Sequence, residues 1–242
     1  MDFYSWGLNV GRIAGIRIRL HWILILWWAL RLDDLLGRSR EDRLLVIGIW
    51  ALGVVLMFGS ILLHELGHCF AARSTGGWAS DILLWPLGGL AFCECPDFWK
   101  SHFFTAVAGP LVSAAIAGVS YAALLGARAL FGDALTASYL VDFLVAYSAG
   151  VLIKWNLMIC IFNLLPIYPM DGGRIFHSLL WAYYSRGGGY AWGGYSLASR
   201  VTLHVSRVTA VLGIAYAVYF QRDLFLAGLF LWVLLQTESL RR

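Results

Sequence analysis

LLVIGIWALGVVLMFGSILLHELGHCFAAR, residues 44 to 73, is the stretch that decides the fold. Its first twenty residues are apolar or small and carry no charge, and ionisable side chains begin only at His64. A helix rises about 1.5 Å per residue, so the stretch is long enough to cross the hydrocarbon core of a bilayer, which is about 30 Å thick. It therefore predicts a transmembrane helix with ionisable side chains near one end.

The composition of the whole chain agrees with a membrane protein. Of its 242 residues, 60% are apolar and 13% are charged, whereas soluble proteins have about half and about a quarter. The net charge of +4 comes without the clustered basic residues that nucleic-acid binding needs. The N-terminus lacks the pattern of a cleaved signal peptide, so we expect it to be retained.

Other apolar segments extend the prediction to the rest of the chain. Including the stretch above, we expect about six transmembrane helices, with both termini on one side and a moderate Arg and Lys excess that favours the cytoplasm for that side. The remaining five spans are residues 20–32, 103–126, 138–163, 206–221 and 224–237. The sequence thus predicts a multi-spanning α-helical membrane protein in which residues 1–242 form a single embedded domain.

Three segments depart from the helical pattern. Residues 13–19, IAGIRIR, alternate apolar and basic side chains, which predicts a short strand at the membrane surface. Residues 76–101 place Gly and Pro around apolar residues, which predicts a β-hairpin or re-entrant region. Residues 185–194 are rich in glycine and predict a flexible interfacial loop.

The motif His64-Glu65-Leu66-Gly67-His68 carries the clearest chemistry. Two histidines four residues apart lie on one face of a helix, where both can reach one metal ion. Glu65 between them is placed to act as a general base toward metal-activated water. The alternative is a pair of unrelated histidines satisfied by neighbouring helices, which is less favoured because ionisable residues inside a span are costly and usually functional.

A catalytic zinc usually has three protein ligands, so His64 and His68 need one more. Asp171 is the best candidate, because it follows an apolar helix at a point where prolines break the helix and two glycines allow close backbone approach. The alternative is that Asp171 caps the N-terminus of a helix over residues 172–184. The sequence leaves both interpretations open.

HELGH followed by FNLLPIYPMDGGR, residues 162–174, resembles the site-2 protease family of intramembrane metalloproteases. LWPLGG at residues 84–89 and AGPL at residues 108–111 are similar to further segments of that family. The resemblance implies a catalytic core at about residues 44–184, one zinc ion per chain held by His64, His68 and Asp171, and Glu65 as the base. Neither a PDZ nor a CBS segment is recognisable.

The resemblance also bears on three polar residues. It implies that Asn163 contacts the substrate backbone or the developing oxyanion. Asn156 lies two helical turns earlier on the same face, where an interhelical hydrogen bond is at least as well supported as a substrate contact. Ser113 stands where many members of the family carry asparagine, which puts a secondary contact in doubt.

The expected function is therefore that of an intramembrane zinc metalloprotease. The resemblance implies that it hydrolyses peptide bonds in or near the membrane span of a single-pass protein. The compact form of the chain and the lack of a targeting peptide favour a prokaryotic plasma membrane as its location. We expect the substrate to unwind and to pair with a strand at residues 82–92. The alternatives are a metal-binding membrane transporter and an inactive scaffold; Glu65 between the two histidines favours the enzyme.

Three remaining residues have weaker interpretations. Cys93 and Cys95 alternate onto one face of the expected strand, where a second metal site is a minor alternative to simple packing. Lys154 lies in the middle of an expected span and is interpreted as a partner of an acidic group or a lipid, with no part in catalysis.

Overall fold

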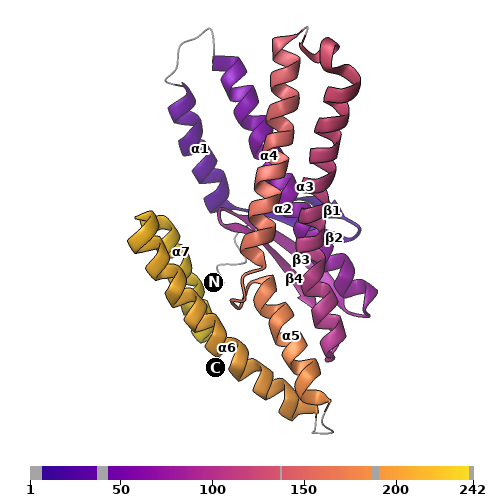
Figure 1. The fold of residues 1–242 in the computed structure, drawn as a ribbon, viewed down its shortest axis with the longest axis vertical. Helices are drawn as coiled ribbons and strands as arrows, with labels where there is room; N and C mark the ends of the chain where they lie inside the picture. Colours follow the sequence, from indigo (N-terminus) through magenta and orange to yellow (C-terminus); the bar gives the residue numbers. More distant parts are fainter. Residues whose placement is uncertain (1–6, 37–42, 137, 187–190, 240–242) are drawn as a thin grey trace.

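The computed structural model describes residues 7–36, 43–136, 138–186 and 191–239. Long helices rise above a small sheet, and a second group of helices lies below it (Figure 1). The helices are α1 (Trp22–Leu36), α2 (Arg43–Ser74), α3 (Trp99–Thr136), α4 (Tyr139–Asn163), α5 (Asp171–Ser185), α6 (Ala191–Tyr216), the π-helical turn η2 (Ala217–Gln221) and α7 (Leu224–Ser239).

Four of the described helices are long and apolar enough to cross a membrane, as expected of an integral membrane protein. They are α2, α3, α4 and α6 with its π-helical extension, and α7 has a shorter apolar stretch at Leu224–Thr237. The predicted count of six spans is thus not confirmed. The predicted span at residues 206–221 is only the second half of a helix that begins at Ala191. The predicted Gly-rich loop therefore overlaps this helix, while its residues 187–190 lie outside the described part.

A mixed four-stranded sheet accompanies the helices. Its strands are β1 (Gly7–Ile13), β2 (Ile16–His21), β3 (Trp78–Trp85) and β4 (Gly88–Glu94), in the order β1-β2-β3-β4. β2 and β3 are parallel, and the two outer pairs are antiparallel hairpins. The hairpin predicted within residues 76–101 is confirmed, and β4 is an edge strand.

The single strand predicted at residues 13–19 is wrong in extent. The chain reverses at Ala14 and Gly15, which have φ angles of 50° and 81°, and these residues join β1 to β2. The alternation of apolar and basic side chains holds only from Ile16 to Arg19. Ile13, Ala14, Gly15 and Ile16 are four successive apolar or small residues, which is where the period of two breaks and the chain reverses. The basic residues of β2 find their partner on β3, where Asp81 lies 3.0 Å from Arg17 and 3.3 Å from Arg19.

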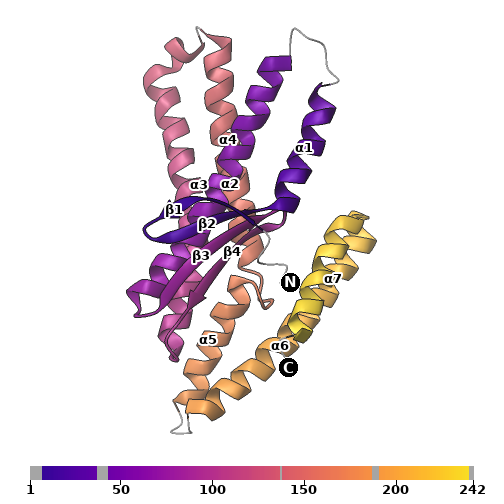
Figure 2. The ribbon, with the colours of Figure 1, turned by 180° about the vertical axis from the view of Figure 1, so that it is seen from behind.

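The sheet packs on the end of α2 that carries the HELGH motif (Figure 2). Buried apolar residues of the two central strands, among them Ile18 and Ile82, form a cluster with Leu66 and Cys69 of α2. Along the first part of β2 these residues alternate with arginines, as expected for a sheet with one covered face. β3 differs, because its residues 81–84 are all buried. The sheet thereby fixes the helical turn that carries the motif.

Asn156 joins α4 to α2. It is fully buried, and its Nδ2 donates to Ser60 Oγ at 2.8 Å and to Leu152 O at 2.8 Å. The interhelical hydrogen bond, one of the two interpretations of Asn156, is therefore present. Lys154 lies exposed on α4, and the structure shows no ion pair for it within the described ranges.

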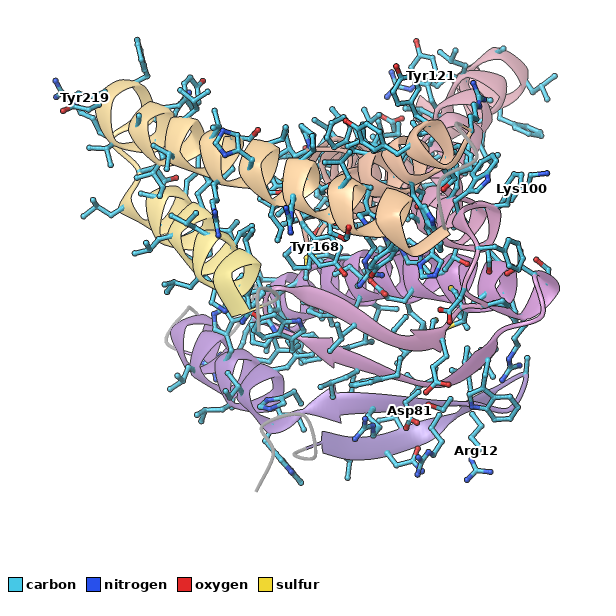
Figure 3. All side chains as sticks on the ribbon, turned by 90° about the horizontal axis from the view of Figure 1, so that it is seen from below. Arg12, Asp81, Lys100, Tyr121, Tyr168 and Tyr219 are labelled. Atoms are coloured by element: carbon cyan, nitrogen blue, oxygen red, sulfur yellow. The ribbon has the colours of Figure 1, made fainter. Side chains whose placement is uncertain are left out.

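The Pro-rich loop between α4 and α5 is held by the lower helices. Ile167 is fully buried in a cluster with Phe230 and Val233 of α7. The Tyr168 N–H donates to Ser206 Oγ at 2.8 Å, and Thr237 Oγ1 donates to Tyr168 O at 2.8 Å. Figure 3 shows Tyr168 between α6 and the sheet. The loop thus has a fixed path into the start of α5.

Candidate metal centre

Three potential metal ligands meet between α2 and α5. His64 and His68 lie one turn apart on α2, and Asp171 is the first residue of α5; all three are buried. His64 Nε2 lies 3.2 Å from His68 Nε2 and 3.2 Å from Asp171 Oδ2, and His68 Nε2 lies 3.3 Å from the same oxygen. Among the described residues, this is the group of three or more His, Cys, Asp or Glu side chains that is close enough to hold one ion.

The donor set fits zinc in both chemistry and spacing. Zinc is bound by imidazole nitrogen and carboxylate oxygen at about 2.0–2.2 Å, which separates two ligands of a tetrahedral site by roughly 3.3 Å. The three distances above agree with this spacing. His64, His68 and Asp171 therefore form a potential zinc-binding group.

Hydrogen bonds on the far side of each imidazole orient the two histidines. His68 Nδ1 lies 2.7 Å from Thr105 O, and His64 Nδ1 lies 3.0 Å from Ser113 Oγ. A carbonyl oxygen only accepts, so Nδ1 of His68 carries the proton and its Nε2 offers a lone pair to the centre. Sequence reasoning put the contact of Ser113 in doubt, yet the residue is fully buried and bonds directly to His64.

Replacing Ser113 by alanine is expected to weaken zinc binding about 10- to 100-fold, the usual cost of losing such an outer partner. Titration of the purified protein with a competing chelator would measure the change. Ser178→Ala is a matched control, because this buried hydroxyl donates its hydrogen bond to the carbonyl of Arg174 in its own helix. Equal affinities for the two variants would show that Ser113 does not support His64.

Asp171 reaches the centre because of the glycines that follow it. A Cβ on Gly172 would collide with the carbonyl oxygen of Leu164, and one on Gly173 would lie 2.6 Å from the carbonyl carbon of Ile167. Only glycine allows α5 to start so close to the Pro-rich loop. The N-cap of α5 is Met170, so the interpretation of Asp171 as the N-cap is wrong.

The electrostatic surroundings keep Asp171 ionised. Burial raises the pKa of its carboxyl, but without a metal ion the Nε2–H groups of His64 and His68 hydrogen-bond to the carboxylate, outweigh burial and hold the pKa well below its usual range. A bound metal ion would take the place of these Nε2 protons and would leave each Nε2 its lone pair. A carboxyl group must be ionised to bind a metal cation, so Asp171 has the charge that a metal ligand needs.

Glu65 lies between the ligand pair and the sheet. It is 9% exposed, and its Oε2 accepts a hydrogen bond from the Ala91 N–H of β4 at 3.1 Å. A Cβ on Gly89 would collide with the Glu65 side chain, so this glycine gives the carboxylate its space. The structure thus places the predicted base against the edge strand, a neighbour that the motif alone does not reveal.

Gly109 of α3 closes the other side of the centre. A Cβ at this position would run into His68 Nε2 and would lie 2.7 Å from His64 Nε2. The glycine of the AGPL segment therefore leaves free the space in front of both Nε2 atoms.

The remaining predicted residues lie elsewhere. Asn163 is the partly buried last residue of α4, and its role stays a prediction. Cys93 and Cys95 do not share a site: Cys93 Sγ lies 3.5 Å from Cys69 Sγ, and Cys95 Sγ lies 3.4 Å from Thr105 Oγ1. The minor alternative of a second metal site there gains no support from the part of the chain that the structure describes.

A cavity of about 300 Å³ lies next to the centre, between α3, α5, α6 and β4. Its lining includes Cys93, His102, Thr105, Arg174 and His177. Thr105 also binds His68 through its carbonyl, so the cavity reaches the back of the ligand pair. Burial and the nearby His102 lower the pKa of His177 to about 4, so this imidazole is neutral at pH 7.

Comparison with known proteins gives relatives over most of the chain. The model of Peptidase family M50 matches residues 134–189, which include α4, the Pro-rich loop and Asp171. A zinc metalloprotease of Methanocaldococcus jannaschii is 30% identical over 237 residues, which is 97% of this chain and 61% of that protein. Rip3 of Mycobacterium tuberculosis is 33% identical over 185 residues, 72% of this chain and 44% of Rip3.

The chain therefore spans only 44% to 61% of the length of these relatives. Among solved structures, the site-2 protease from Methanocaldococcus jannaschii superposes with a TM-score of 0.60 and 24% sequence identity. The match covers 98% of this chain and 96% of that one, so the two share their fold along the whole chain.

Proposed function

We propose that the chain is a member of peptidase family M50, the family of the site-2 proteases, and that it is an intramembrane zinc endopeptidase. The observation that carries the proposal is the buried group of His64, His68 and Asp171, with nitrogen and oxygen donors 3.2–3.3 Å apart and Glu65 beside it. The reaction is hydrolysis of a peptide bond in or near the membrane span of another protein.

In the proposed mechanism, different residues of the chain bind zinc and transfer the proton. His64, His68 and Asp171 hold the zinc, which when bound supplies Lewis acidity toward the scissile carbonyl and toward water. Glu65 takes a proton from the attacking water and later gives it to the leaving amine. Its Oε2 is held by the Ala91 N–H, which leaves Oε1 to carry that proton.

Burial of the site strengthens these interactions. His64, His68 and Asp171 are 2%, 5% and 6% exposed, so little bulk water competes with their charges and hydrogen bonds. Water and substrate must still enter, and the cavity beside Thr105 offers a space for water next to His68. Asn163, by family resemblance, is assigned to the substrate backbone or the oxyanion.

The substrate binds as an extended strand. A transmembrane helix hides its carbonyls in hydrogen bonds, so the segment to be cut must unwind first. The sequence-based prediction of a pairing strand at residues 82–92 crosses the turn between β3 and β4; β4, Gly88–Glu94, is the edge strand next to Glu65. Pairing along β4 would bring a substrate carbonyl to the base.

The substrate class and the location follow from the same proposal. We assign the substrate to single-pass membrane proteins and the enzyme to the plasma membrane of a prokaryote, since the relatives named above come from an archaeon and a bacterium. The enzyme would lie in the bilayer with the helices α2, α3, α4 and α6 as its spans.

Zinc removal tests the proposal. The full chain, purified in detergent, is expected to hold close to one zinc per chain and to cut a reporter protein with a single transmembrane segment. Treatment with a strong chelator should abolish both, and added zinc should restore both. Zinc without cleavage, combined with zinc transport in vesicles, would favour the transporter; absence of zinc would favour the scaffold.

A further inference from the structure

Two of the four cysteines touch each other beside the candidate metal centre. Cys69 directly follows His68 on α2, and Cys93 lies on β4; both thiols are free, and their Sγ atoms are 3.5 Å apart. We propose that Cys69 and Cys93 are a modification site at which a low-molecular-weight disulfide forms a reversible cross-link. The effect of this cross-link on cleavage rests on the proposed function; its formation does not.

The two thiols differ in access. Cys69 is fully buried in the cluster between α2 and the sheet. Cys93 is partly exposed and lines the cavity of about 300 Å³, as does Arg174, whose positive charge favours an anionic reagent. A reagent that enters the cavity therefore meets Cys93 first, and Cys69 is the thiol placed to resolve the product.

The chemistry is two thiol–disulfide exchanges. The Cys93 thiolate attacks one sulfur of the reagent, forms a mixed disulfide and releases one thiolate. The Cys69 thiolate then attacks Sγ of Cys93 and displaces the second. One reagent disulfide is reduced to two thiols, which take up the two protons, and the protein gains one disulfide. A thiol reductant reverses both steps.

The other two cysteines have different surroundings. Cys95 also lines the cavity, but its Sγ lies 3.4 Å from Thr105 Oγ1 and not beside another sulfur. Cys160 is a partly buried residue of α4. A disulfide requires the two sulfur atoms to approach to about 2.05 Å. Cys69 and Cys93 need a small displacement to do so, which makes this pair the expected product.

The cross-link acts on the strand that holds the predicted base. Cys93 is two residues beyond Ala91, whose N–H binds Glu65. A substrate that pairs with the edge of β4 must fit beside the Glu65 side chain, which is bound to this N–H, so β4 and α2 must adjust to each other during binding. A covalent bond between them restrains that adjustment without removing any zinc ligand. We expect several-fold slower cleavage with zinc retained.

The test uses the full chain in detergent and its Glu65→Gln variant. Both are treated with oxidised glutathione, remaining thiols are alkylated, and the digest is analysed by mass spectrometry. A peptide pair joined through Cys69 and Cys93 is expected in both proteins, and equally in Cys160→Ser. The linked peptide pair should be missing in Cys93→Ser and in Cys69→Ala. If one of these variants does not fold, the other provides the test.

Cleavage of the reporter supplies the second readout. Oxidised protein should cut several-fold more slowly, dithiothreitol should restore the rate, and Cys93→Ser should not respond to oxidant. Absence of the Cys69–Cys93 link, or equal linkage to Cys95 or Cys160, overturns the proposal. If the disulfide forms but the cleavage rate stays unchanged, the proposed restraint on β4 is refuted. The disulfide is detected by mass spectrometry in Glu65→Gln, which needs no protease activity. A missing disulfide can therefore be distinguished from a missing protease activity.

Discussion

Glu65→Gln is expected to abolish cleavage of a transmembrane reporter while zinc remains bound at the level of the unaltered chain. Glutamine keeps the shape of the side chain and can still accept the hydrogen bond from Ala91 N–H, but it cannot take a proton from water. General acid–base catalysis contributes about 10²- to 10⁴-fold to enzymatic rates, and a loss of at least that size is expected. The zinc content is unaffected because the ligand group is His64, His68 and Asp171.

Zinc analysis and the cleavage rate, measured on the same preparation, check this prediction. Glu94→Gln is the matched control, since Glu94 is an exposed glutamate at the end of β4 and should leave both measurements unchanged. Cleavage that survives Glu65→Gln would exclude Glu65 as the base and, with it, the mechanism proposed above. Loss of zinc in this variant would mean that Glu65 also supports the metal.

The sequence predicts those features that depend on local periodicity. α2 runs from Arg43 to Ser74, against a predicted span of residues 44–73, because a long apolar run has few alternatives in a membrane. The position of His64 and His68 on one face follows from the helical period alone. The prediction of Asp171 as the third ligand cannot rest on helical period, because it lies 107 residues from His64. It rests on the Pro and Gly pattern together with the family resemblance.

What the sequence does not predict depends on contacts between distant segments. Ser113 and Thr105 orient the two histidines from α3, 49 and 37 residues away in the chain, and no periodicity marks either of them. The reversal at Ala14 and Gly15 is missed when the alternation of residues 16–19 is extended back over Ile13, Ala14 and Gly15, which are successive apolar or small residues. The Cys69–Cys93 contact likewise needs the sheet to be folded against α2.

Gly109→Ala is expected to remove zinc and activity together, although it adds only one methyl group. The new Cβ would occupy the space in front of His68 Nε2 and lie 2.7 Å from His64 Nε2. These contacts are with the imidazoles that hold the metal, and both rings are fixed from behind by Ser113 and Thr105. The rings can make room only by giving up those hydrogen bonds, which moves both Nε2 atoms away from the spacing that zinc needs.

Gly118→Ala on the same helix separates this effect from helix propensity. A Cβ at Gly118 meets nothing within 4 Å, so alanine there should leave zinc and cleavage unchanged and stabilise the helix by about 0.5–1 kcal/mol. Zinc content, cleavage rate and thermal unfolding in detergent are measured for both variants. Loss of zinc in Gly109→Ala, while its unfolding temperature equals that of the zinc-free unaltered chain, would assign the glycine to the metal centre. Full zinc occupancy in Gly109→Ala would show that the histidines relax without cost, and that this glycine serves only the packing of α3 on α2.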